Sequence, residues 1–319
     1  MKTIDASELL SQYAGGTRDF HAVDLQGAGL RSAELSGICL KRAILSETDF
    51  SAANLMEADL NGAILVQAHL RGTRLNGGHL IGAVLNGAIL THADLSGAKL
   101  WRTSLKQAQL QQANLSRANL DESHLNEADL SQANLAAAQL HKTDFSQATL
   151  IEAYFSRANL SQARLVGANL SGANLEQTDL TSANLSHADL RRANLNGANL
   201  SQANLKNANL SGANLTGANL CKANLNEATL VLANLRGANL EWAELTSANL
   251  TEADLGWVTL HQANLSGAIL QHATLTDVHF SSTILRGADL SSAKLSQPLQ
   301  GQSTHLSWVT LPDTSLVLP

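Results

Sequence analysis

The feature that most constrains the fold of this chain is a strict period of five residues. Residues 191–220 read RRANLNGANLSQANLKNANLSGANLTGANL, in which Ala-Asn-Leu recurs at every fifth position. A period of five advances about 72° per residue, whereas an amphipathic helix advances about 100° and a half-buried strand about 180°. The pattern therefore excludes a helix bundle and a flat sheet, and a fixed period of this kind is typical of a solenoid.

The repeat continues without a break from residue 16 to residue 295. Every position divisible by five from 20 to 295 is Leu or Phe. Most of these residues have Ala two positions earlier and Asn or Asp one position earlier, and the remaining two positions are mixed and mostly polar. The pattern indicates that one large and one small residue in five point inward. A chain that turns a corner every five residues would close one coil after four repeats.

These A(D/N)LXX tandem repeats resemble the pentapeptide-repeat proteins, and the short segment before them resembles the start of stand-alone cyanobacterial members. The resemblance implies an all-β fold: a right-handed quadrilateral β-helix, or pentapeptide-repeat solenoid, with a short N-terminal capping helix. Residues 16–295 would then form about 14 coils, each in contact only with its neighbours.

The segment 1–15 is expected to form the N-terminal cap. Asp5 or Ser7 is placed to cap a short helix, and Gly15 and Gly16 are placed to end it. The helix would have a short apolar face, made of Leu9, Leu10 and Tyr13.

The segment 296–319 is expected to form an irregular last coil and C-terminal cap. It holds all three prolines of the chain, and the Leu pattern resumes there one residue out of step, at Leu306, Leu311 and Leu316. The resemblance implies that this end is a dimer contact, as it is in some members of the family.

Composition narrows the classes of partner and compartment. The chain has 21 basic and 27 acidic residues and a formal net charge of −6, which argues against a nucleic-acid-binding surface. No apolar run reaches about 18 residues, so we expect no membrane span. The start lacks the basic and apolar pattern of a signal peptide, so we expect a cytoplasmic protein. Cys39 and Cys221 lie about nine coils apart, too far to form a disulfide.

Chemistry must be sought along columns, because residues twenty apart stack on one face. Ser104, His124 and Asp144 share a column in the order of a hydrolase triad. A smooth convex face offers neither an oxyanion hole nor a pocket that excludes water, so a hydrolase is a remote alternative. No metal-binding or phosphate-binding motif is present. We therefore expect no enzyme activity, no metal and no cofactor.

Other columns predict structure rather than chemistry. Asparagines at twenty-residue intervals are expected to form side-chain amide ladders. Two such columns stand in the most regular part of the chain: Asn174, Asn194, Asn214 and Asn234, and Asn199, Asn219 and Asn239.

Two sets of apolar residues occupy positions that are expected to face outward. A contiguous exposed apolar patch marks an interaction site more often than scattered residues do, although β-branched residues also stabilise a sheet face. The first apolar patch comprises Ile44, Ile64, Val66, Ile81, Val84, Ile89 and Trp101. The second apolar patch comprises Val231, Leu232, Trp242 and Trp257.

These observations favour a non-catalytic structural protein that docks another protein, in a process that the sequence does not name. The partner would be another protein or a second copy, bound through the first apolar patch or the C-terminal cap. The alternative is a DNA mimic that inhibits DNA gyrase, like the quinolone-resistance pentapeptide proteins. Its support is a local acidic zone: Asp121, Glu122, Glu127, Asp129, Asp144 and Glu152.

Overall fold

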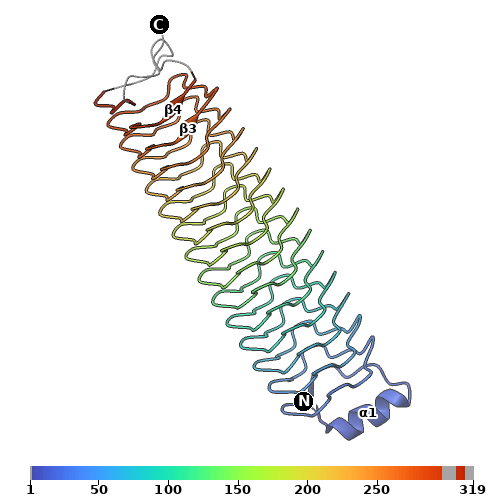
Figure 1. The fold of residues 1–319 in the computed structure, drawn as a ribbon. Helices are drawn as coiled ribbons and strands as arrows, with labels where there is room; N and C mark the ends of the chain where they lie inside the picture. The colour runs from blue at the N-terminus through green and yellow to red at the C-terminus, as the bar shows by residue number, and fades with distance from the viewer. Residues whose placement is uncertain (1, 297–306, 313–319) are drawn as a thin grey trace. The chain divides into compact units, whose positions relative to one another are not determined.

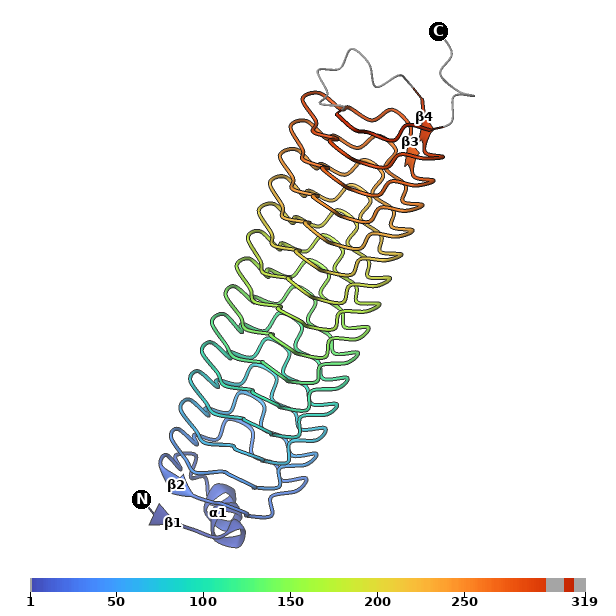
Figure 2. The ribbon, with the colours of Figure 1, turned by 90° about the vertical axis from the view of Figure 1, so that its left-hand side faces the viewer.

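The computed structural model describes residues 2–296 and 307–312. The chain divides into two compact units, Met1–Asn159 and Leu160–Pro319. Within each unit the backbone winds in stacked coils, as Figures 1 and 2 show. Parallel bridges join residues twenty apart, such as Asp24 to Ile44 in the first unit and Asn194 to Asn214 in the second. Both units are therefore β-helical solenoids with a twenty-residue coil, and four bridges mark each coil.

Regular strands are few among the described residues, because the coils pair mostly through isolated bridges at one residue in five. The elements are β1 (Lys2–Thr3), α1 (Ala6–Ala14), β2 (Val23–Asp24), β3 (Thr274–Leu275) and β4 (Lys294–Leu295). Strand β1 pairs with β2, and β3 pairs with β4, both in parallel. No helix in the described ranges is long and apolar enough to cross a membrane.

The interior of each unit is filled by the fifth residue of every repeat, with the small residue two positions earlier beside it. Leu195 and Ala193, for example, are completely buried. Burying one Leu side chain contributes about 1.5–3 kcal/mol relative to leaving it exposed. Where two Phe replace Leu in one coil, the rings of Phe145 and Phe155 meet edge to face with centroids 6.2 Å apart. The inward and outward assignment of the repeat is thus the one that the sequence predicts.

Hydroxyl residues at the small interior position are also accommodated. Thr48 donates a hydrogen bond of 2.8 Å to the carbonyl oxygen of Leu25, and Thr103 donates one of 2.9 Å to that of Leu80. Both threonines are fully buried. Because each hydroxyl group has a hydrogen-bond partner, its burial does not destabilise the core.

Each corner is a tight turn that begins at the buried Leu. The Ala28 N–H donates to the carbonyl oxygen of Leu25 at 3.0 Å, and the intervening Gly27 has φ +66°. A hydrogen bond from the N–H of the fourth residue to the carbonyl oxygen of the first, with positive φ at the third residue, is the pattern of a type II turn. Gly is frequent at this position in the repeats, which is consistent with the positive φ that the turn requires there.

At the N-terminus α1 begins at an Asp5 cap, whose side chain accepts from the Glu8 N–H at 2.8 Å, and ends at Gly15. Leu9 is fully buried, whereas Leu10 is 38% exposed. Tyr13 donates its hydroxyl to the carbonyl oxygen of Ser36 at 2.8 Å. Of the two expected caps Asp5 is the one in use, and the buried part of the apolar face is Leu9.

The segment 307–312 pairs with the last regular coil in a shifted register. Thr310 bridges to Asp289, a separation of 21 residues instead of twenty, and the Leu290 N–H donates to the Thr310 carbonyl at 2.8 Å. One extra residue therefore lies between these paired segments. Leu311 is half exposed. Leu306 and Leu316 lie outside the described residues, as does most of the expected C-terminal cap.

Candidate functional site

The first apolar patch is built on one column of bridged residues in the first unit. Ile44 bridges to Ile64, and Ile64 bridges to Val84. Ile64 is 40% exposed, and Ile44 and Val84 are partly exposed. Their side chains stand at the outward position next to a buried Leu, where Asn or Asp is usual. Three successive coils thus present branched apolar side chains on one face.

The remaining residues of the first apolar patch surround this column. Ile81 and Trp101 occupy the same turn position on successive coils, and the Gly82 N–H donates to the Trp101 carbonyl at 3.1 Å. Trp101 is 36% exposed. Val66 lies at the corner that follows Ile64. Ile89 bridges to His69, five residues beyond Val84, so it lies on the neighbouring face.

Charged side chains flank the first apolar patch. The Arg102 guanidinium lies 4.2 Å from the centre of the Trp101 ring and donates to Glu122 at 2.8 Å. This hydrogen bond lowers the pKa of the Glu122 carboxyl below its usual value. Lys41 forms an ion pair with Asp59 at 3.0 Å. An apolar centre with a charged rim is the usual arrangement of a protein-binding surface.

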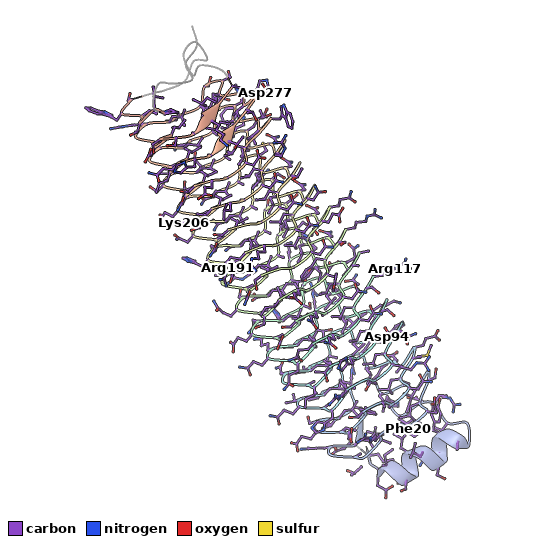
Figure 3. All side chains as sticks on the ribbon, in the orientation of Figure 1. Phe20, Asp94, Arg117, Arg191, Lys206 and Asp277 are labelled. Atoms are coloured by element: carbon purple, nitrogen blue, oxygen red, sulfur yellow. The ribbon has the colours of Figure 1, made fainter. Side chains whose placement is uncertain are left out.

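Charged side chains also project elsewhere on both units, as Figure 3 shows for Arg117 and Lys206. Lys206 pairs with Glu227 at 3.2 Å, and both side chains are about half exposed. Exposed pairs of this kind contribute little to stability.

The column of Ser104, His124 and Asp144 continues directly from the apolar column. Val84 bridges to Ser104, Ser104 to His124, and His124 to Asp144. The Ser104 hydroxyl, however, donates to Asn86 at 2.6 Å. Asp144 accepts from the backbone N–H and the hydroxyl of Ser146 at 3.0 and 2.6 Å. The three residues share a column, but the hydroxyl of Ser104 is directed at an amide rather than at an imidazole.

Within residues 2–296 and 307–312, no group of three or more His, Cys, Asp and Glu residues is arranged to hold a metal ion. At the surface, the His21 Nδ1 atom lies 2.9 Å from the Asp19 Oδ1 atom, which also accepts from the His21 backbone N–H at 3.2 Å. This contact lowers the pKa of the Asp19 carboxyl.

The predicted Asn ladders are present in part in the second unit, where they link Asn174, Asn194 and Asn214 in one column and Asn199 and Asn219 in the other. The side-chain amide of Asn194 donates to Asn174 at 3.4 Å and that of Asn214 donates to Asn194 at 3.2 Å. In the other column Asn219 donates to Asn199 at 3.1 Å. The side-chain Oδ1 atom of Asn194 also accepts from the backbone N–H of Asn196 at 3.2 Å. Asn194 therefore caps the turn that follows it and links successive coils.

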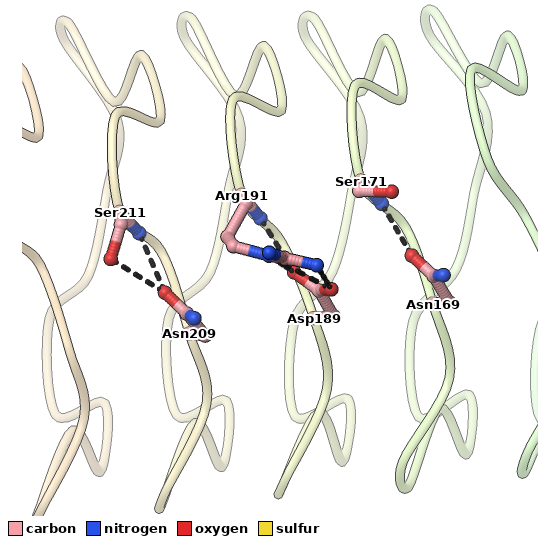
Figure 4. A network of polar contacts seen from close by, with 6 residues as sticks. All are labelled: Asn169, Ser171, Asp189, Arg191, Asn209 and Ser211. Atoms are coloured by element: carbon pink, nitrogen blue, oxygen red, sulfur yellow. Dashed lines mark hydrogen bonds and ion pairs between the residues drawn. The ribbon is translucent and has the colours of Figure 1, made fainter.

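Asp189 occupies the position that Asn holds in neighbouring coils, as Figure 4 shows. It also caps the following turn, but its side chain bonds to Arg191 of the same coil. Asp189 bridges to Asn169 and Asn209, and its carboxylate accepts from the backbone N–H of Arg191 at 3.1 Å. The Arg191 guanidinium donates to the same carboxylate at 2.8 Å. This hydrogen bond holds the pKa of the Asp189 carboxyl below its usual range.

The second apolar patch is divided by the geometry of the coil. Leu232 and Trp242 are 61% and 48% exposed. They are ten residues apart in a twenty-residue coil, so the structure places them on opposite sides of the unit. Val231 lies beside Leu232. Trp257, which is 56% exposed, stands at the corner next to that of Trp242 and one coil further on.

The acidic zone consists of carboxylates that already have partners. Glu122 is bonded to Arg102, and Asp129 accepts from Gln111 at 2.7 Å. Glu127 accepts from Gln107 and Glu152 accepts from Gln132, at 2.8 and 2.9 Å.

The fold and these surfaces define a class: a β-helical solenoid of five-residue repeats with decorated outer faces. The family model for pentapeptide repeats matches overlapping segments that extend from residue 24 to residue 297. The chain therefore belongs to the pentapeptide-repeat family.

Several solved structures of pentapeptide-repeat proteins are similar to this chain. HetL, involved in heterocyst differentiation regulation in the cyanobacterium Nostoc, is 38% identical over 77% of this chain and 96% of HetL, with a TM-score of 0.35. QnrB1, a plasmid-mediated fluoroquinolone resistance protein, is 19% identical over 57% of this chain and 90% of its own, with a TM-score of 0.42. A protein of the Arabidopsis thaliana thylakoid lumen is 40% identical over 32% of this chain and 65% of its own, with a TM-score of 0.24. The curated proteins contain no match.

Proposed function

We propose that this protein is a non-catalytic docking protein of the cytoplasm that binds another protein through the first apolar patch. The observation that carries the proposal is the exposed column of Ile44, Ile64 and Val84 beside Trp101. Parallel bridges hold the backbone of these residues in a fixed register, so little backbone entropy would be lost on binding. Trp and its neighbouring Arg are the residue types most often found at energetically dominant contacts.

We also propose a specific geometry for the scaffold. Residues 16–295 would form a right-handed β-helix of square cross-section, with caps at residues 1–15 and 296–319. Four bridges in each twenty-residue coil and the parallel pairing support this description.

The test compares two variants of similar design. Ile64→Glu combined with Trp101→Glu places charge in the centre of the first apolar patch. Ile151→Glu places one such charge on another turn of the first unit, at a residue that is also 36% exposed. Proteins captured from source-cell lysate are identified by mass spectrometry and then purified for a direct binding measurement.

We expect a purified partner to bind the parent and the Ile151→Glu protein alike, and to bind the double variant at least about a hundredfold more weakly. All three proteins should retain the same circular dichroism spectrum. A partner that binds the double variant as tightly as the parent would show that this column serves only sheet packing.

Inhibition of DNA gyrase is the second candidate, and the acidic zone is its support. A DNA mimic needs carboxylates that are free to replace phosphates, whereas Glu122 is paired with Arg102. We expect no inhibition of supercoiling at micromolar protein. Inhibition that is weakened by Glu127→Lys and Asp129→Lys would favour the mimic over the docking protein.

A further inference from the structure

Trp257, in the second unit, is held by its neighbours in one orientation although its ring is largely exposed. The Arg236 guanidinium lies 4.1 Å from the centre of the ring, and the indole N–H donates to the Asp277 carboxylate at 3.1 Å. Arg236 is itself fixed by an ion pair of 3.0 Å with Asp254. The residue nevertheless remains 56% exposed. An aromatic ring that is both rigid and accessible is suited to ligand binding, because little side-chain entropy is lost.

Gly256 leaves space beside this arrangement. A Cβ atom at this position would lie 3.1 Å from the Arg236 Nη1 atom and 3.2 Å from the Asp254 Oδ1 atom. Gly256 is not among the residues with positive φ, so the backbone does not require glycine here. The absence of a side chain instead leaves room for the guanidinium to reach Asp254 while it covers the indole. The four side chains therefore form one packed unit, which we call the Trp257 platform: Arg236, Asp254, Trp257 and Asp277.

The charges of the Trp257 platform restrict the ligand that it could accept. Arg236 covers one face of the indole, and its positive charge opposes a second cation on the same ring. The carboxylates of Asp254 and Asp277 oppose a phosphate or another anion. A neutral ligand meets neither repulsion. The Asp277 carboxylate also has lone pairs beyond the one that accepts the indole N–H, so it has room to accept hydroxyl donors.

We propose that the Trp257 platform binds a neutral carbohydrate. The apolar C–H face of a sugar ring would stack on the exposed part of the indole, and a hydroxyl group beside it would donate to Asp277. Hydrogen bonds from a neutral donor to a carboxylate are stronger than those between neutral groups, and this would orient the sugar on the ring. This site lies in the second unit and does not depend on the docking role of the first apolar patch.

The test measures binding of four neutral oligosaccharides: cellohexaose, laminarihexaose, xylohexaose and hexa-N-acetylchitohexaose. Saturation-transfer NMR detects contact with the sugar, and calorimetry gives the dissociation constant. The variants are Trp257→Ala, which removes the ring, and Gly256→Ala, which displaces Arg236 but keeps the ring. Trp242→Ala is the matched control, because Trp242 is 48% exposed and contacts His261 edge to face instead of a guanidinium.

We expect the parent and the Trp242→Ala protein to bind at least one of these sugars with equal affinity. Trp257→Ala should weaken that binding by about tenfold or more, and Gly256→Ala by a smaller factor. Absence of binding of all four sugars to the parent at millimolar concentration would overturn the proposal, as would equal binding by the Trp257→Ala protein. Binding of a decaproline peptide that depends on Trp257, without binding of any sugar, would assign the Trp257 platform to proline-rich segments instead.

Discussion

At the scale of single residues, the third residue of each four-residue turn is held in the left-handed region. Many of these residues are not glycine: Ala137, for example, has φ +56° and Gln132 has φ +58°. A non-glycine residue in this region costs about 1–2 kcal/mol. The stacked coils impose this conformation many times over, which is possible because each turn is bonded to the next coil as well as closed on itself.

Two glycines in the first unit allow this cost to be measured. Gly97 has φ +64°, whereas Gly29 lies outside the left-handed region, and a Cβ at either position would meet no atom within 4 Å. We expect Gly97→Ala to destabilise the protein by about 1 kcal/mol and Gly29→Ala to be neutral or to stabilise it by about 0.5 kcal/mol. Urea unfolding of the two variants checks the difference, and equal effects would exclude backbone strain as its cause.

The ion pair between Asp189 and Arg191 predicts how the stability of the protein depends on pH. The unfolded pKa of an Asp is about 3.9. The Arg191 guanidinium lowers the folded pKa of Asp189. A lowered folded pKa means that the stabilisation is fully present above the unfolded value and is lost as pH falls through the folded value.

Asp189→Asn keeps the cap on the Arg191 N–H but loses the charge. We therefore expect its stability to fall less steeply with decreasing pH than that of the parent, below about pH 4. Thermal unfolding midpoints between pH 7 and pH 2 give the comparison. Identical pH profiles for the two proteins would show that this ion pair makes no contribution to acid sensitivity.

At the scale of the elements, the Asn ladder combines two roles in one side chain. Asn194 caps the turn at Asn196 and links the coils of Asn174 and Asn214. We expect Asn194→Ala to destabilise the second unit by about 1–2 kcal/mol, because it removes all three hydrogen bonds. Asn194→Asp keeps the acceptor and loses only the donor, so its cost should be smaller. Denaturant unfolding orders the two variants, and equal costs would place the main contribution in the hydrogen bond that Asn194 donates to Asn174.

The ladders and the interior could be predicted from the sequence because both depend only on the period. The inward Leu and Ala residues and the twenty-residue columns follow from which positions repeat. The turn conformation was less accessible, although the recurrence of Gly at one position of the repeat pointed to it. The Ser104 hydroxyl donates to Asn86 because of its side-chain rotamer, and the sequence pattern does not specify rotamers. The same holds for the support of Trp257 by Arg236, since these residues are 21 positions apart.

At the scale of the whole molecule, the ends decide whether a solenoid is soluble, because an uncovered coil exposes apolar side chains and unpaired backbone groups. The helix α1 was predicted from its caps, but β1 was not, since a two-residue strand carries no periodic signal. Lys2 and Thr3 nevertheless pair with the first coil. The shifted register at Thr310 matches the one-residue offset in the Leu pattern.

The N-terminal cover can be tested with neighbouring residues of α1. Leu9 is fully buried and Leu10 is 38% exposed. We expect Leu9→Asp to destabilise α1 by several kcal/mol and to promote aggregation through the uncovered first coil. Leu10→Asp should leave the protein soluble. Light scattering after size-exclusion chromatography distinguishes the two, and equal solubility would mean that α1 is not needed as a cover.

The twenty-residue coil also sets a rule for how such genes are able to change length. Duplication or loss of four repeats adds or removes a whole coil and leaves every later column on its original side. Duplication of a single repeat preserves the Leu and Ala pattern, and so the fold, but moves all later residues to the adjacent side. Ile44, Ile64 and Val84 would no longer be aligned if one repeat were inserted between them. Descendants of one ancestral sequence could therefore keep the same interior while presenting entirely different surfaces.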